Sequence, residues 1–130
     1  MLHETLTSDI LNAFYQVYNT LGYGFLEKVY ENALAKELAK RGHQIKQQAP
    51  IQVYYQGEAV GEYFADILVD EKVILELKAA EEIAKSHEAQ LLNYLKATGI
   101  QVGLVLNFGP KAQFKRKIFT KTQPTTHQKT

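Results

Sequence analysis

The sequence predicts an α/β fold, a mixed four-stranded β-sheet flanked by helices, with its elements in the order ααβββαβ. Two amphipathic helical segments begin the chain, three strand-like segments with turn signals follow, and a last helix precedes a continuous apolar run. A strand, a helix and a strand buried on both faces form the pattern of a parallel pair, whereas tight turns join antiparallel strands. The sheet should therefore contain both kinds of pairing.

The chain has 130 residues, one domain's worth, and its hydrophobic fraction of 45% and charged fraction of 22% are ordinary for a globular protein. We expect a single domain over residues 1–120 and a flexible tail over residues 121–130, where apolar residues are scarce. There is no cysteine, so a bound metal would need oxygen or imidazole ligands. No stretch resembles a signal peptide or approaches the ~20 apolar residues of a membrane span, so we expect a soluble cytoplasmic protein.

Three helices are expected, and each has a start or stop signal. Their ranges are 8–21, 26–41 and 86–97. The expected N-caps are Ser8 and Ser86, and the glycines that end the helices are Gly22, Gly42 and Gly99.

Four strands are expected, over residues 45–55, 59–69, 72–79 and 102–108. Pro50 cannot donate a ladder hydrogen bond, so the first strand should lie at a sheet edge or carry a bulge. Gln56-Gly57 predicts a hairpin turn after it. The last strand, "VGLVLNF", shows no polar alternation, which indicates burial on both faces.

The hairpin "DILVDEKVILELKA" places three charged residues, Asp66, Glu76 and Lys78, inside apolar strands. Glu76 and Lys78 share a face because side chains alternate along a strand. A three-residue loop over 70–72 would set Asp66 opposite Glu76, with Cβ atoms ~5 Å apart. In that register Leu68 meets Ile74 on the same polar face, and the pairs on the other face are Ile67–Leu75 and Ala65–Leu77. A two-residue turn would separate the two carboxylates.

Two adjacent carboxylates repel each other, and a divalent cation removes the conflict. Mg²⁺ prefers one or two carboxylates together with waters and phosphate oxygens. Lys78 could then orient or deprotonate a water, or stabilise charge on a phosphate. These are the parts needed for metal-assisted phosphodiester hydrolysis. The alternative is a salt bridge between Asp66 and Lys78 at a sheet end, with Glu76 in solvent.

Two helical segments supply further polar residues. Glu27 begins the second helix, either as a third carboxylate aimed at the metal or as a complement to the helix N-terminus, worth ~0.3–1 kcal/mol. His87, Gln90 and Tyr94 form one polar stripe on the last helix, whose N-terminal end should lie near Lys78. The stripe could bind a nucleotide or a water, or it could be an ordinary solvated face. His87 fits a hydrogen-bonding group better than a metal ligand.

The C-terminal part of the chain is basic. No acidic residue follows Glu88, whereas seven are basic: Lys96, Lys111, Lys115, Arg116, Lys117, Lys121 and Lys129. Such a charge asymmetry indicates an anionic partner such as nucleic acid, or else a solvated basic tail.

"GYGFLEKVYENAL" carries the pattern Gly24-x-x-Glu27-x-x-Tyr30, and with "ELKA" and "HEAQLLNYLKATG" it resembles the GxxExxY proteins of the PD-(D/E)xK nuclease-like superfamily. The resemblance runs from the first helix to Phe108 and implies a restriction-endonuclease-like core. It implies that Asp66 is the motif aspartate, although Ala65 replaces the proline before it. The matched positions are Glu76 and Lys78 for the ExK pair, Glu27 for the helical acidic residue, and Gln90 and Tyr94 for the QxxxY motif.

The hypothesis is a Mg²⁺- or Mn²⁺-dependent nuclease acting on DNA or RNA. Glu27, Asp66 and Glu76 would be the metal site, and Lys78 and Gln90 would complete the catalytic set. The residues expected to bind substrate are Tyr30, His87, Gln90, Tyr94, Lys111, Lys115, Arg116 and Lys117. The alternative is a non-catalytic nucleic-acid-binding or protein-assembly module with the same fold. The active form could need a homodimer or a partner protein.

Overall fold

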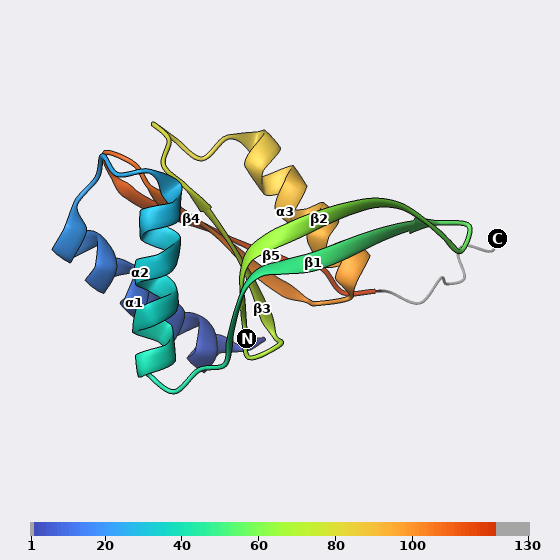
Figure 1. Ribbon diagram of the computed structural model, residues 1–130, viewed down its shortest axis with the longest axis horizontal. Helices are drawn as coiled ribbons and strands as arrows, with labels where there is room; N and C mark the ends of the chain where they lie inside the picture. Colours follow the sequence, from blue (N-terminus) through green and yellow to red (C-terminus); the bar gives the residue numbers. More distant parts are fainter. Residues whose placement is uncertain (1, 122–130) are drawn as a thin grey trace.

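The computed structural model describes residues 2–121, which form a five-stranded mixed sheet between two layers of helices (Figure 1). The elements in chain order are α1 (Glu4–Leu21), α2 (Glu27–Lys40), β1 (Ile45–Tyr55), β2 (Glu58–Val69), β3 (Val73–Lys78), α3 (Lys85–Thr98), β4 (Val102–Phe108) and β5 (Ala112–Ile118). The strands lie side by side in chain order, and all neighbours are antiparallel except the parallel pair β3–β4. The predicted α/β class is confirmed.

The expected strand count of four is wrong, because β5 pairs with β4 along its whole length. It contains three consecutive basic residues, and only one strand borders it, so it resembles a basic loop in the sequence. The turn before it depends on Gly109, where a Cβ atom would lie 1.9 Å from the carbonyl oxygen of Ala80. Most of the expected flexible tail lies outside the described residues.

Two helices begin earlier than their expected N-caps. α1 begins at Glu4, so Ser8 lies inside the helix. α3 begins at Lys85, and its cap is not Ser86: the Nδ1 atom of His87 accepts a hydrogen bond of 3.0 Å from the backbone N–H of Ala84. None of the helices within residues 2–121 combines the length and apolar character of a membrane span.

The sheet has a hydrophobic core on each face. α1 and α2 cover one face, where Ile67, Leu75 and Leu77 are buried. α3 covers the other, where Leu68 and Ile74 are buried. Every residue of β4 is buried, which confirms the expectation of a strand covered on both faces. The far half of the β1–β2 hairpin extends beyond these layers (Figure 1).

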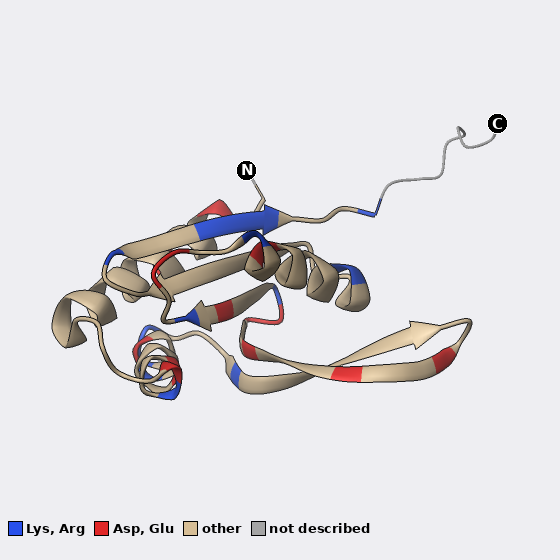
Figure 2. Ribbon diagram, turned by 90° about the horizontal axis from the view of Figure 1, so that it is seen from above, with Lys and Arg blue, Asp and Glu red and all other residues tan. Residues whose placement is uncertain are grey.

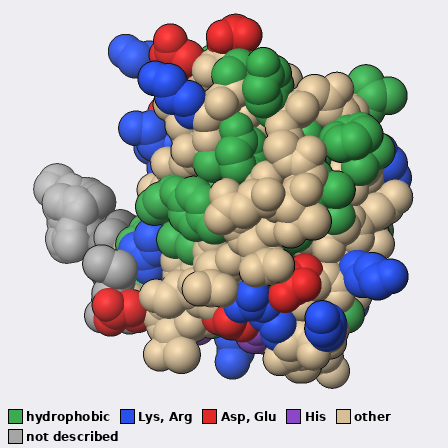
Figure 3. All heavy atoms as spheres, turned by 90° about the vertical axis from the view of Figure 1, so that its left-hand side faces the viewer, with side chains coloured by type: hydrophobic (Ala, Val, Ile, Leu, Met, Phe, Trp, Pro, Cys, Tyr) green, Lys and Arg blue, Asp and Glu red, His purple; other side chains and the backbone are tan. Residues whose placement is uncertain are grey.

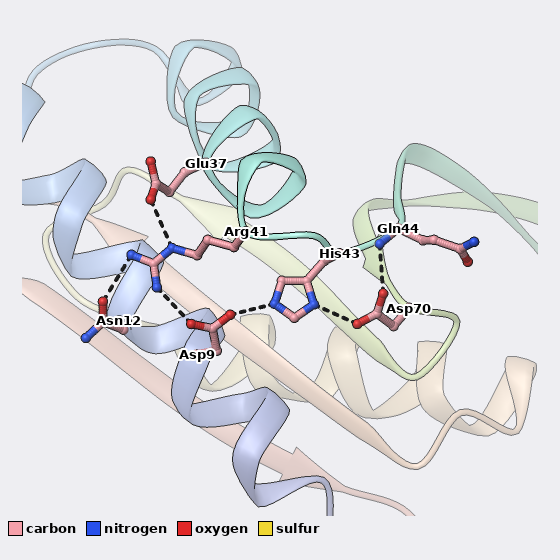
Figure 4. A network of polar contacts seen from close by, with 7 residues as sticks. All are labelled: Asp9, Asn12, Glu37, Arg41, His43, Gln44 and Asp70. Atoms are coloured by element: carbon pink, nitrogen blue, oxygen red, sulfur yellow. Dashed lines mark hydrogen bonds and ion pairs between the residues drawn. The ribbon is translucent and has the colours of Figure 1, made fainter.

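A polar network joins α1, the end of α2 and the β2–β3 turn (Figure 4). The imidazole of His43 lies between Asp9, at 2.5 Å from Nε2, and Asp70, at 2.7 Å from Nδ1. Arg41 donates to Asp9 at 2.8 Å and to Glu37 at 2.9 Å. The hydrogen bond to Asp9, with that to Asp70, raises the pKa of His43 above its ordinary value. When it is protonated, His43 donates to both carboxylates and links α1 and the end of α2 to the β2–β3 turn.

We predict that His43→Gln lowers the free energy of unfolding by about 1–3 kcal/mol at pH 6, because it removes charged hydrogen bonds. The raised pKa means that this stabilisation is complete below the ordinary histidine pKa and is lost as the pH rises through the folded value. The difference between variant and wild type should therefore shrink by pH 9 in urea titrations. His3→Gln is the control, since the His3 side chain makes no hydrogen bond within residues 2–121. A pH-independent difference would contradict the prediction.

Candidate active site

The β2–β3 hairpin has the predicted register over its closed end. Val69 lies opposite Val73, Leu68 opposite Ile74 and Ile67 opposite Leu75, as a three-residue turn requires. Asp70 and Glu71 in the turn both have positive φ angles. Asp66 and Glu76 come next along the two strands, and both interact electrostatically with Tyr94 of α3.

Beyond Ile67 the two strands diverge, so the expected pair Ala65–Leu77 is wrong. On the other side of β2 the ladder pairs Gln47 with Ile67 and Ala49 with Ala65 but skips Gln48, whose φ is +53°. The irregularity changes the face that β2 presents, because Ala65 belongs to the core under α3. The strands separate where the charged residues lie.

The carboxylates of Asp66 and Glu76 take over the hydrogen bonding at this point. The backbone N–H of Asp66 donates to Oε2 of Glu76 at 3.1 Å, and the backbone N–H of Leu77 donates to Oδ2 of Asp66 at 2.8 Å. Each carboxylate thus satisfies a backbone donor that would otherwise lack a partner. The second oxygen of Asp66 lies 3.4 Å from the amide nitrogen of Gln48, and Oε1 of Glu76 accepts no hydrogen bond from the described residues.

Burial makes this pair electrostatically costly. Glu76 is 4% exposed, and burial, together with the neighbouring charge of Asp66, raises its pKa to about 8. Burial also raises the pKa of Asp66. The site therefore favours a bound proton or a bound cation over two bare negative charges.

Lys78 follows on the same face and is half-buried. Its ammonium interacts electrostatically with Asp66, Glu76 and His87. Within residues 2–121, however, no ion pair joins it to Asp66, and Glu76 is buried rather than solvated. The salt-bridge alternative is therefore wrong, and the ammonium can bind another group.

The N-terminus of α2 approaches the carboxylates without joining them. Glu27 is exposed, and its charge contributes to the raised pKa of Glu76 after burial and Asp66. Within the part of the chain that the structure describes, no three acidic or histidine side chains are close enough to ligate one ion. A direct role for Glu27 as a metal ligand therefore stays a prediction.

Tyr30 is a core residue, so the expectation that it binds substrate is wrong. Its side chain is fully buried and stacks on Phe108, with ring centroids 4.4 Å apart. Its hydroxyl donates to the carbonyl of Gly22 at 2.6 Å and accepts from the N–H of Phe25 at 3.2 Å. Tyr30 thus fixes the loop that leads to Glu27.

Glu31 is a buried carboxylate that the sequence analysis missed. It is 4% exposed and accepts hydrogen bonds from Lys28 at 3.2 Å, Gln47 at 2.8 Å and Gln48 at 3.0 Å. Because Gln48 also contacts Asp66, Glu31 belongs to the surroundings of the carboxylate pair. Its position four residues after Glu27, on the same helix face, was the available signal.

A hollow of about 590 Å³ lies beside Glu27, between the α1–α2 loop, the segment after β3 and the β4–β5 turn. Tyr23, Phe25 and Leu26 in that loop are exposed. Figure 3 faces this end of the molecule and shows apolar side chains gathered on it. Glu27 therefore lies beside a hollow whose lining combines apolar side chains with a second carboxylate, Glu81.

The N-terminal end of α3 lies near Lys78, as its position after β3 predicts, because His87 interacts electrostatically with Lys78. Burial, and after it the charge of Lys78, lowers the pKa of His87. The Nδ1 atom of His87 caps the helix. Tyr94 is 7% exposed, and burial, then the charges of Glu76 and Asp66, raises its pKa to about 12. Gln90 is half-buried on the same groove wall as Tyr94.

Two of the basic residues expected to bind substrate, Arg116 and Lys117, make contacts within the protein. Lys117 pairs with Glu88 of α3 at 2.8 Å. Arg116, the preceding residue, points to the opposite face of the sheet and donates to the carbonyl of Leu2 at 2.5 Å. These contacts contradict the expected role of Arg116 and reduce that of Lys117. Lys111 and Lys115 remain exposed, but β4 separates β5 from β3 (Figure 2).

The residues present fit a hard divalent cation. Asp66 and Glu76 supply oxygen ligands, each has an oxygen not used by the backbone, and their mutual repulsion is relieved by a positive charge. Waters or substrate oxygens would have to complete the coordination.

Comparison with protein-family models identifies the superfamily of the chain. The model of the PD-(D/E)XK nuclease superfamily matches residues 4–118. The chain belongs to this superfamily. Nucleases of the superfamily generally use divalent metal ions. The comparison with curated proteins found no match.

Two solved structures share the fold. SSO0001 has a TM-score of 0.57 and 13% sequence identity over 92% of this chain and 61% of that one. The alkaline exonuclease LHK-Exo from Laribacter hongkongensis has a TM-score of 0.51 and 11% identity over 91% of this chain and 71% of that one. At these identities the likeness is one of fold, and the chain spans about three-fifths of the length of SSO0001.

We predict that Glu76→Gln stabilises the metal-free protein by about 1–4 kcal/mol at pH 9. The folded pKa of about 8 lies above the ordinary value, so stability is complete below the ordinary pKa and falls as the pH rises through 8. Glutamine carries no charge and still accepts the N–H of Asp66. Unfolding in urea with a chelator, at pH 5 and pH 9, measures the effect.

The matched control for that comparison is Glu62→Gln, on the exposed part of the hairpin, which should change stability little. If Glu76→Gln were less stable than wild type at pH 9, the carboxylate pair would not carry the electrostatic cost inferred here.

Proposed function

We propose that the protein is a metal-dependent nuclease of the GxxExxY group that hydrolyses phosphodiester bonds of DNA or RNA with Mg²⁺ or Mn²⁺. One observation carries the proposal: a buried carboxylate, Glu76, and a half-buried one, Asp66, converge where β2 and β3 diverge, beside a half-buried lysine without an ion-pair partner among the described residues. The shared fold of LHK-Exo, described as an alkaline exonuclease, supports it.

Each residue has a role that its position supports. Asp66 and Glu76 would hold the metal through their carboxylate oxygens, with Glu27 reaching it through water. When bound, the ion supplies a Lewis acid for the phosphate and lowers the pKa of a bound water. The ammonium of Lys78 donates a hydrogen bond to the attacking water or to a phosphate oxygen.

The α3 residues act on the substrate rather than on the metal. The amide of Gln90 orients a phosphate or a water, and Tyr94 positions the nucleotide next to the carboxylates. The proposal places the activity in the cytoplasm. A duplex substrate would require a second copy or a partner protein, because a single chain has little structure to enclose it.

We predict that Lys78→Ala lowers the rate of cleavage about 10²- to 10³-fold, because it removes a charged donor to the reacting groups. The assay is cleavage of a plasmid and of a single-stranded oligonucleotide with Mg²⁺ or Mn²⁺. Lys72→Ala, at the closed end of the same hairpin, is the control and should cleave like wild type. A chelator should abolish cleavage by all three proteins.

Equal cleavage by wild type and Lys78→Ala would indicate a contaminating nuclease and remove the catalytic proposal. The second candidate is a non-catalytic nucleic-acid-binding or assembly module. It is favoured by the convergence of only two carboxylates among the described residues. Calorimetric binding of Mg²⁺ without cleavage of any substrate would support that candidate.

A further inference from the structure

A groove of about 740 Å³ runs between α3 and the projecting half of the β1–β2 hairpin. Two tyrosines of the hairpin and one of the helix line it, together with polar side chains of α3. The residues that matter here are Tyr54, Tyr63, Gln90, Asn93, Tyr94 and Lys96.

The tyrosines present aromatic surface to the groove. The ring of Tyr63 lies 5.6 Å from that of Tyr94, tilted by 43°, and Tyr63 is 49% exposed. Tyr54 is 63% exposed, and it reaches the groove because the ladder shifts register between Val53 and Tyr54. A bulge thus directs an additional aromatic side chain toward the helix.

Tyr94 connects the groove with the surroundings of the carboxylates. Tyr94, on its inner wall, interacts electrostatically with both Glu76 and Asp66. Its outer end opens along the hairpin, away from the core. A chain seated in the groove would therefore run along the tyrosines as far as Tyr94, next to the candidate active site.

We propose that this groove binds a single-stranded segment of nucleic acid, whose bases stack on Tyr54 and Tyr63. The delivery of its backbone to Asp66 and Glu76 rests on the proposed function. Every base has a face that can stack on an aromatic ring, whereas a duplex keeps those faces inside its own stack. The amides of Gln90 and Asn93 add hydrogen bonds to bases.

The groove carries little charge. Lys96 is the one charged residue among those that line it. Binding should therefore depend on stacking more than on phosphate contacts. The logarithm of the affinity should fall with the logarithm of salt concentration with a slope of about −0.7 to −1.4, corresponding to one or two phosphate contacts.

The test uses the full chain in a chelator, so that binding is measured without cleavage. Fluorescence anisotropy with labelled oligo(dT), oligo(U) and a hairpin duplex, with about 12 nucleotides per strand, compares the three ligands. Tyr54→Leu and Tyr63→Leu should each weaken binding of the single strands about tenfold. Tyr55→Leu is the matched control, because Tyr55 is 66% exposed on the same hairpin but does not line the groove.

The proposal is overturned if the duplex binds as tightly as the single strands, if nothing binds, or if the two variants bind like the control. Loss of binding only in Lys115→Ala would assign recognition to β5 instead. Tyrosine-dependent binding without cleavage in Mn²⁺ would leave the groove in place and remove the nuclease function. If both tyrosine variants retained full cleavage activity, the nuclease function would stand and the role of the groove would be removed.

Discussion

The candidate active site depends on two hydrogen bonds from backbone N–H groups to carboxylates. They cross the open end of the β2–β3 hairpin. They hold Asp66 and Glu76 next to each other at a place where the strands no longer bond to one another. A sheet that stayed paired would direct its N–H groups to carbonyls and leave the carboxylates in solvent. The divergence of the strands therefore leaves two backbone N–H groups without carbonyl partners, and the carboxylates of Asp66 and Glu76 accept their hydrogen bonds.

The rest of the fold keeps that divergence in place. The β1–β2 ladder is interrupted at Gln48, which has a positive φ, and the amide of Gln48 links Asp66 to the buried Glu31 of α2. Asn107 on β4 holds the chain after Lys78, because its amide makes two hydrogen bonds of 2.9 Å to the backbone of Ala80. Neighbouring elements on both sides thus fix a site that would otherwise relax to separate two like charges.

The features that depend on local pattern could be predicted from the sequence. The length of the β2–β3 turn determined the register, and the unbroken apolar run of β4 indicated its central place. The predictions that failed involve tertiary context. Tyr30 has the polarity of a binding residue, but its position against Phe108 makes it a core residue. Glu31 looked like an ordinary helix-surface residue because nothing in the sequence shows that β1 covers it.

The central claim is that the carboxylate pair Asp66–Glu76 is a cation site, and crystals soaked in Mn²⁺ test it most directly. The account predicts an anomalous difference peak in contact with oxygens of both Asp66 and Glu76, on the face that carries Lys78. A peak elsewhere, or none at this position while both carboxylates keep their hydrogen bonds to the backbone, would contradict it.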